Sequence, residues 1–198
     1  MAEAKDSKTT NPSSTGVEAN SSVRAFSWSK WLVLAAISGT LLYYLKHRGE
    51  QLKAASLVPT RILDVRFGFT PDTAYEALRD MGTAGRQIYA EMNKVDFILV
   101  PIMMRQFFLN TFPSKSPARA QLRDVLITTC VVGDVIENVC VLVLLRTYPR
   151  RLDTVAWVCC VGNVVKYCAT GPGLLTVVFE AGLWIKGAIS RLLKSKQQ

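Results

Sequence analysis

Four long apolar segments constrain this chain more than any other feature of its sequence. They span residues 26–45, 95–112, 125–145 and 155–179. The hydrocarbon core of a bilayer is about 30 Å thick, and roughly 20 helical residues are needed to cross it. Because a single spanning segment satisfies its backbone hydrogen bonds in lipid only as a helix, we expect an all-α membrane protein, a bundle of four transmembrane helices.

A soluble helical domain with very apolar core helices is the alternative. Hydrophobic residues make up 49% of the chain, and they are concentrated in blocks. A helix at the surface of a soluble domain presents a polar stripe to water. The stretch from Val139 to Leu145 has no such stripe, which favours the membrane protein.

The net charge of +9 comes from basic residues that gather at the ends of the apolar segments and in the C-terminal tail. Examples are Lys46 and Arg48 after the first segment, and Arg150 and Arg151 after the third. Such positions suit lipid headgroups. No nucleic-acid-binding motif accompanies the charge. The expected partner is therefore the lipid bilayer, and not a nucleic acid.

All five cysteines lie in the third and fourth segments, and the single histidine is His47. None of the cysteines has the spacing of metal ligands. We interpret them as polarizable apolar side chains, and we expect neither a metal nor a cofactor.

The connections carry local signals. Residues 1–25 are poor in large apolar side chains, which predicts a disordered tail. In the long connection 46–94, Thr70-Pro71 is typical of a helix start and Gly82 of a helix end. A second helix from Thr83 continues into the second span. Aromatic and aliphatic residues of these two amphipathic helices are expected at the membrane interface; they are Tyr75, Leu78, Ile88 and Tyr89.

The last two spans have three features. The connection 146–154 is short, so these helices should be antiparallel neighbours. Gly171-Pro172-Gly173 predicts a kink, or alternatively a broken helix near a binding site. Residues 180–198 form a basic amphipathic tail and are expected to lie as a helix on the membrane surface.

Polar residues inside the spans are the main functional clue. Asp134, Glu137 and Asn138 follow at i, i+3 and i+4 and share one helix face. A second polar stripe on the fourth span contains Asn163 and Lys166. The predicted polar network comprises Asp96, Arg105, Asp134, Glu137, Asn138, Asn163 and Lys166.

The depth of the charges indicates that they pair. Arg105, Asp134, Glu137 and Lys166 all fall near the midpoints of their segments. One central charge costs about 2.5–3.5 kcal/mol on insertion scales, so four unpaired charges would cost roughly 10 kcal/mol. That is comparable with the stability of a whole domain. Two positive and two negative charges can instead compensate one another inside the bundle.

Two functions are compatible with this network. The first, which charge balance favours, is a non-catalytic membrane protein, a structural or accessory component that works with other membrane subunits. The second is an intramembrane enzyme or carrier for a lipid-soluble or small polar substrate. In that case Asp134 or Glu137 would be the acid or base, Lys166 would tune it, and Asn138 would orient the substrate.

One set of motifs resembles a known group of proteins. The motifs run from Leu63-Asp64-Val65-Arg66-Phe67-Gly68 through Gly85-Arg86-x-x-Tyr89 to Asp134-x-x-Glu137-Asn138 and Lys166. They resemble a group of small, uncharacterised four-span membrane proteins, mostly bacterial. The resemblance covers residues 30–180 and implies four spans. It also implies one shared site, made of Asp96, Asp134, Glu137, Asn138 and Lys166, and it implies no activity.

The C-terminus ends in Lys194-Ser195-Lys196-Gln197-Gln198. Lysines at the third and fifth positions from the end are similar to the signal that returns membrane proteins to the endoplasmic reticulum. This signal predicts a reticulum protein with a cytosolic C-terminus.

Overall fold

The structure is a computed structural model that describes residues 28–59, 61–111, 114 and 116–195. Within these ranges the side chains of 28, 30–31, 98–100, 102–111, 191–192 and 194–195 are not described. The predicted tail 1–25, the end of the C-terminal signal and the side chain of Arg105 therefore lie outside the described residues.

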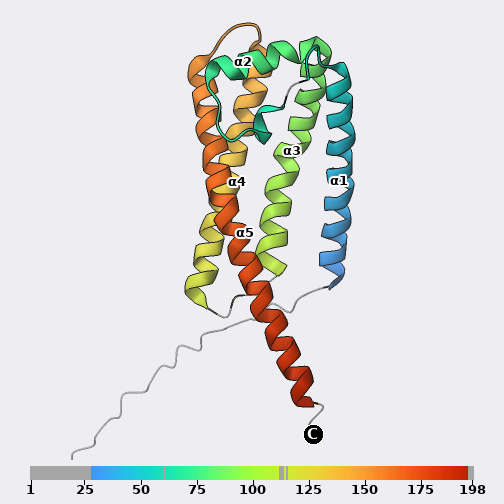
Figure 1. The fold of residues 1–198 in the computed structure, drawn as a ribbon, viewed down its shortest axis with the longest axis vertical. Helices are drawn as coiled ribbons and strands as arrows, with labels where there is room; N and C mark the ends of the chain where they lie inside the picture. The colour runs from blue at the N-terminus through green and yellow to red at the C-terminus, as the bar shows by residue number, and fades with distance from the viewer. Residues whose placement is uncertain (1–27, 60, 112–113, 115, 196–198) are drawn as a thin grey trace, which may run out of the picture.

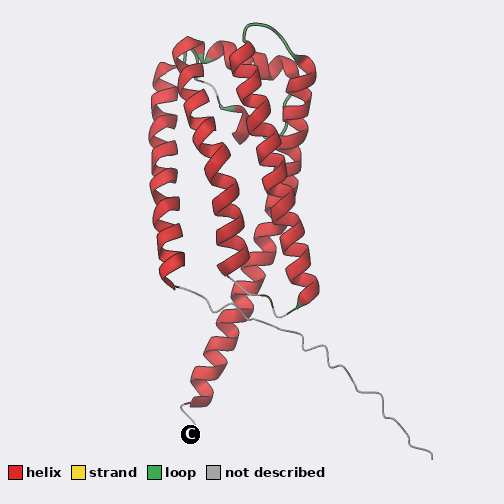
Figure 2. Cartoon of the chain, turned by 180° about the vertical axis from the view of Figure 1, so that it is seen from behind, coloured by secondary structure: helices red, strands yellow, loops and turns green. Residues whose placement is uncertain are grey.

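The described chain is all helical, which confirms the predicted class. Four long helices stand side by side, and a short one lies across one end of them (Figure 1; Figure 2 gives the reverse view). The elements are α1 (Trp28–Ala55), the 3-10 turn η1 (Leu63–Val65), α2 (Pro71–Asp80), α3 (Gly82–Thr111), α4 (Pro117–Thr147) and α5 (Asp153–Ser195). No strand occurs among the described residues.

Two of the long helices are long and apolar enough to cross a membrane. Among the described residues, these helices are Pro117–Thr147 and Asp153–Ser190. The predicted segments 125–145 and 155–179 lie inside them. The first predicted segment falls mainly in α1, where Ser38, Thr40 and two tyrosines dilute the apolar residues. The second predicted segment forms the C-terminal half of α3, most of whose side chains are not described.

Helices α4 and α5 form the closest helix pair, and they are antiparallel neighbours as predicted (Figure 1). Two glycines allow this close approach. A Cβ atom on Gly133 would lie 2.8 Å from the carbonyl oxygen of Gly162 and 2.8 Å from the backbone nitrogen of Lys166. A Cβ atom on Gly162 would lie 3.0 Å from the carbonyl oxygen of Gly133. Small residues at a crossing let two backbones touch, as in many membrane helix pairs.

The connection between α1 and α3 closes one end of the bundle. The predicted start of α2 is confirmed, because Thr70 Oγ1 accepts a hydrogen bond from Thr73 N at 3.3 Å and Pro71 occupies the first turn. The predicted helix end is also confirmed. Gly82 has φ of +64°, a conformation that favours glycine, and it turns the chain directly into α3.

The amphipathic face of these helices does not lie where we expected. Tyr75, Leu78 and Tyr89 are buried in the protein core rather than placed at a membrane interface. The reason is that α2 lies across the ends of the long helices, so its apolar face covers them. Tyr75 shows this clearly: its hydroxyl donates to Arg150 O at 3.3 Å and accepts from Leu152 N at 2.5 Å in the turn between α4 and α5.

Helix α5 also differs from expectation. It is helical without interruption from Asp153 to Ser195, so Gly171-Pro172-Gly173 does not break it. Pro172 lies on an exposed face of the helix. The predicted surface tail is therefore the last part of α5 as far as Ser195, and it extends beyond the other helices (Figures 1 and 2).

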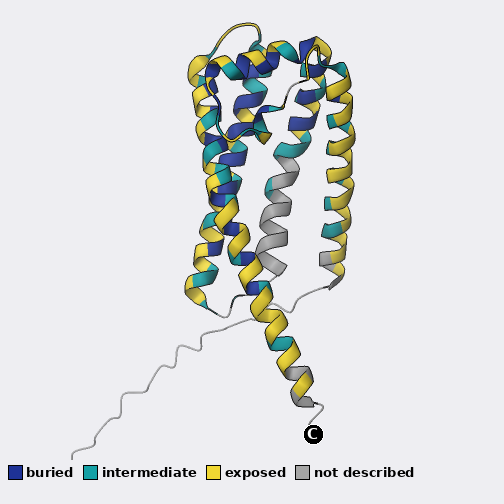
Figure 3. Cartoon of the chain, viewed as in Figure 1, coloured by how far each residue is buried: buried dark blue, intermediate teal, exposed yellow. Residues whose placement is uncertain are grey.

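Many large apolar side chains of the long helices are exposed. On α5, Val161 is 60% exposed and Leu175 is 70% exposed, and on α1, Leu42 is 62% exposed. Figure 3 shows that much of α1 and α5 is exposed. Several charged and amide side chains are buried between the helices, beside a core that is otherwise apolar. Exposed apolar side chains together with buried charges are unusual in a soluble helix bundle.

The glycine contact predicts a strong difference between two substitutions. Gly133→Ala should destabilise the protein by about 1–3 kcal/mol, because backbone atoms of α5 must move to admit the methyl group. Gly182→Ala, on α5, is the control, since nothing lies within 4 Å of its added Cβ atom. It should be neutral or stabilising by up to about 1 kcal/mol. Thermal unfolding in detergent, followed by circular dichroism, measures both. Equal melting temperatures would contradict the contact.

Candidate functional site

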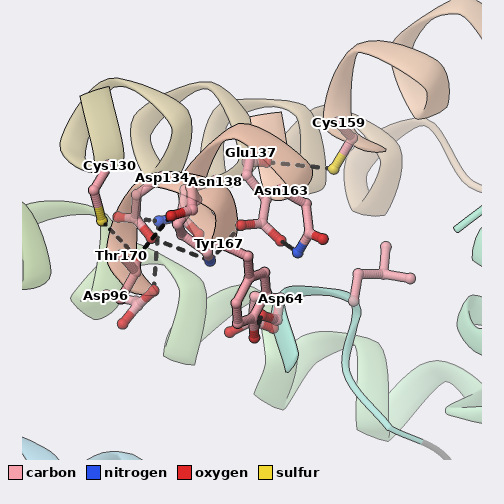
Figure 4. A network of polar contacts seen from close by, with 12 residues as sticks. Asp64, Asp96, Cys130, Asp134, Glu137, Asn138, Cys159, Asn163, Tyr167 and Thr170 are labelled. Atoms are coloured by element: carbon pink, nitrogen blue, oxygen red, sulfur yellow. Dashed lines mark hydrogen bonds and ion pairs between the residues drawn. The ribbon is translucent and has the colours of Figure 1, made fainter. Parts of the chain in front are cut away.

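An ion-paired cluster occupies the interface of α4 and α5 beside the two glycines (Figure 4). Lys166 Nζ lies 3.3 Å from Asp134 Oδ1 and forms a second ion pair with Glu137 Oε2. The side chain of Lys166 is 14% exposed, and those of Asp134 and Glu137 are 3% and 0% exposed. The i and i+3 spacing on α4 places both carboxylates around one ammonium group.

A chain of amides extends this cluster to α3. Asn138 Nδ2 donates to Asp134 Oδ2 at 3.1 Å and points to Asp96 Oδ2 at 3.4 Å. Carboxylates accept hydrogen bonds, so they fix which way the Asn138 amide faces. Its Oδ1 atom then faces α3 and accepts from Asn93 Nδ2 at 2.6 Å. The remaining acceptor, Asn93 Oδ1, is buried, and no donor among the described residues reaches it.

The other end of the cluster holds the connection that leads to α2. Asn163 Nδ2 donates to Glu137 Oε1 at 2.7 Å, and Asn163 Oδ1 accepts from Gly68 N at 3.0 Å. Gly68 has φ of +72°, so glycine suits this close approach. Phe69 N donates to Cys160 Sγ at 3.3 Å. The amide of Asn163 therefore links the ion pairs to an extended piece of backbone.

Asp64 belongs to the same connection and lies between two tyrosines (Figure 4). Tyr89 donates its hydroxyl proton to Asp64 Oδ1 at 3.1 Å, and Tyr167 donates to Asp64 O at 2.8 Å. Burial raises the pKa of the Asp64 carboxyl above its usual range, although Lys166 and the bond from Tyr89 both act to lower it.

The structure brings together the charged residues of the predicted network whose side chains are described. Asp96, Asp134 and Glu137 share the network with Lys166, and Asp64 lies beside it. Lys166 is the one cation among the described side chains of this network. The predicted place of Arg105 in the charge balance lies outside the described side chains.

A cavity of about 370 Å³ opens beside Asp96. It is bounded by the C-terminal half of α1, by η1 and by the first half of α3. Tyr89, Asn93 and Asp96 reach it from α3, and Asp64 reaches it from η1. Its described lining does not include Asp134, Glu137 or Lys166. The ion pairs between α4 and α5 are thus separate from the cavity, and Asn93 and Asp96 belong to both.

Sequence reasoning missed Asn93 and Asp64 as members of the site. A signal for Asn93 was available, because Tyr89, Asn93 and Asp96 follow at i, i+4 and i+7 on one face of α3. Asp64 had no local signal, since its tyrosine partners come from two other elements. All five cysteines are free thiols. One of them, Cys130 Sγ, lies 3.0 Å from Thr170 Oγ1.

The described residues contain no group of histidine, cysteine and acidic side chains arranged to hold a metal ion. Comparison of the chain with protein-family models, curated proteins and solved structures found no match. The function must therefore be inferred from the site itself.

Asn163 should hold the connection in place. Asn163→Leu keeps the approximate volume but removes the acceptor for Gly68 N and the donor to Glu137. Leaving such buried groups without partners costs about 1–3 kcal/mol each. We expect lower stability and faster amide hydrogen exchange at Gly68 and Phe69, measured by mass spectrometry. Cys168→Ala, at an exposed position of the same helix, is the control. Unchanged exchange at Gly68 would show that Asn163 does not hold this segment.

Proposed function

We propose that the chain is a four-span membrane protein with a non-catalytic role, a structural or accessory component whose buried charges hold its helices together. The observation that supports this most is the position of Lys166 between Asp134 and Glu137, with all three side chains nearly inaccessible. Charged groups that are already paired with one another leave no unpaired charge to bind a substrate.

The distribution of polarity supports a membrane environment. Exposed valine, leucine and isoleucine side chains occur on α1, α4 and α5. Hydrocarbon accommodates such side chains without the cost that they have in water. Polar side chains between membrane helices act as specific contacts, because the hydrocarbon offers them no partners. Among the described residues, α4 and the part Asp153–Ser190 of α5 have the length and hydropathy of a span. We propose α1 and α3 as the other two spans.

The alternative, an intramembrane enzyme or carrier that uses Asp134, Glu137 and Lys166, receives less support. An acid or base must reach the proton that it transfers, directly or through one water. The described lining of the cavity beside Asp96 contains none of these three groups. Their contacts are with one another and with Asn138 and Asn163. This arrangement favours a structural role.

Crossing of the membrane can be tested by chemical labelling. Ala118 lies in the first turn of α4, and Arg150 lies in the turn that follows the C-terminal end of α4. Both are exposed, and four spans place them on opposite sides of the bilayer. In sealed vesicles, a membrane-impermeant maleimide should label only one of Arg150→Cys and Ala118→Cys. The other should react after the membrane is permeabilised. The parent chain is the blank, because its own cysteines would lie within the spans. Labelling of both variants in intact vesicles would contradict the proposal.

The structural role of the charges can be tested by removing the central one. Lys166→Met leaves Asp134 and Glu137 buried without a cation, which should cost about 3–5 kcal/mol. The exchange of Glu137→Lys with Lys166→Glu should recover part of this loss. Lys94→Met, at an exposed position, is the matched control. Unfolding in detergent measures all three. A Lys166→Met protein as stable as its parent would contradict the structural role and favour the alternative, a catalytic or transport site.

A further inference from the structure

We propose that the cavity between α1, η1 and α3 binds an organic ammonium ion that carries an apolar chain. This site is distinct from the structural role of the ion pairs, and it does not depend on that role. It is argued from the charges of the lining, from its apolar side chains and from the volume of the cavity.

Asn93 is 2% exposed and is one of the residues that line the cavity. Its Nδ2 atom donates to Asn138, whose own amide is held by Asp134. Among the described residues no donor reaches Asn93 Oδ1, and this oxygen is closed to solvent. Asn93 is therefore part of the wall of the cavity, and the contacts of the ligand are assigned to the carboxylates.

The charges of the lining favour a cation at the inner end. Asp96 and Asp64 line the cavity from two different elements and are both partly shielded from solvent. The two lysines of the lining, Lys46 and Lys53, come from α1 and are exposed. Lys53 is also committed to Glu50, at 2.9 Å. The inner end therefore presents two partly shielded carboxylates, and an ammonium group offers both the charge and the hydrogen-bond donors that they require.

The rest of the lining favours an apolar chain over a bare metal ion. Leu45, Ile62, Val65 and Met92 contribute apolar surface around the inner end. The cavity volume of about 370 Å³ falls at the lower end of the range for sites that bind small organic molecules, about 300–1,000 Å³. A ligand with an ammonium group at one end and a short hydrocarbon chain matches both parts of this surface.

Two glycines of α1 provide a matched pair of variants. Gly49 lines the cavity, and a Cβ atom there would meet only Met92 Cε, at 3.9 Å. Gly49→Leu therefore fills the cavity without touching the acidic groups. A Cβ atom on Gly39 would meet nothing within 4 Å. Gly39→Leu makes the same change on the same helix and leaves the cavity open.

The experiment measures equilibrium binding of radiolabelled octylamine to the full chain in phosphatidylcholine nanodiscs, with empty nanodiscs subtracted. We expect saturable binding to the parent protein and to Gly39→Leu, and its loss in Gly49→Leu. Asp96→Asn should weaken binding at least about tenfold, because it removes a charge-assisted hydrogen bond. Asp72→Asn, at a side chain that is 83% exposed, should not.

Competing ligands identify the chemical group that is recognised. Octanol has the same chain without the charge, and octyltrimethylammonium has the charge without an N–H donor. Both should compete at least about tenfold more weakly than unlabelled octylamine. Equal competition by octanol would overturn the role of the carboxylates. Equal competition by octyltrimethylammonium would overturn the hydrogen bonds from the ammonium group to the carboxylates. Unchanged binding in a folded Gly49→Leu protein, or no saturable binding to the parent protein, would overturn the site itself.

Discussion

The ion pairs of Lys166 with Asp134 and Glu137 are the interaction on which most of the bundle depends. They lie where α4 and α5 touch through Gly133 and Gly162, so the glycines bring the backbones close and the charges set how the helices align. Every further contact of the network is attached to these groups. The Asn138 amide, which is bonded to Asp134, reaches α3. The Asn163 amide, which is bonded to Glu137, reaches the connection before α2. Removal of the cation would therefore affect three helices at once.

The part of this fold that the sequence could predict is the part that depends on near neighbours. Apolar length predicted the helical class, and the chemistry of Thr70, Pro71 and Gly82 predicted both ends of α2. The i, i+3 and i+4 spacing placed Asp134, Glu137 and Asn138 on one face. Contacts between residues far apart in the chain were not predictable in this way. The bond from Gly68 N to Asn163 Oδ1 joins residues 95 positions apart, and nothing local indicates it. The burial of Tyr75 likewise depends on α2 lying across the helix ends.

The polar interior has two parts that differ in how completely they are satisfied. Between α4 and α5 the two carboxylates share one ammonium group, and their neighbouring amides are bonded on both sides. Toward α1, Asn93 has an acceptor to spare, and Asp96 has Asn138 as its one described donor, at 3.4 Å. Both parts contain carboxylates and amides, so the residue types alone do not show which part is fully hydrogen-bonded. The distinction depends on where the cavity lies, and only the three-dimensional arrangement gives that.

The length of α5 determines what the protein presents outside the bilayer. Its 43 residues form a rod of about 65 Å. A bilayer with its headgroups measures about 40–45 Å. In the proposed four-span arrangement α5 is longer than the bilayer is thick, so about 20 Å of the helix projects into the aqueous phase. The end that projects carries the lysines and arginine of residues 186–194. Because the same continuous helix carries Lys166 in its first half, a partner that binds this basic end would hold the helix that bears the cation of the buried ion pairs.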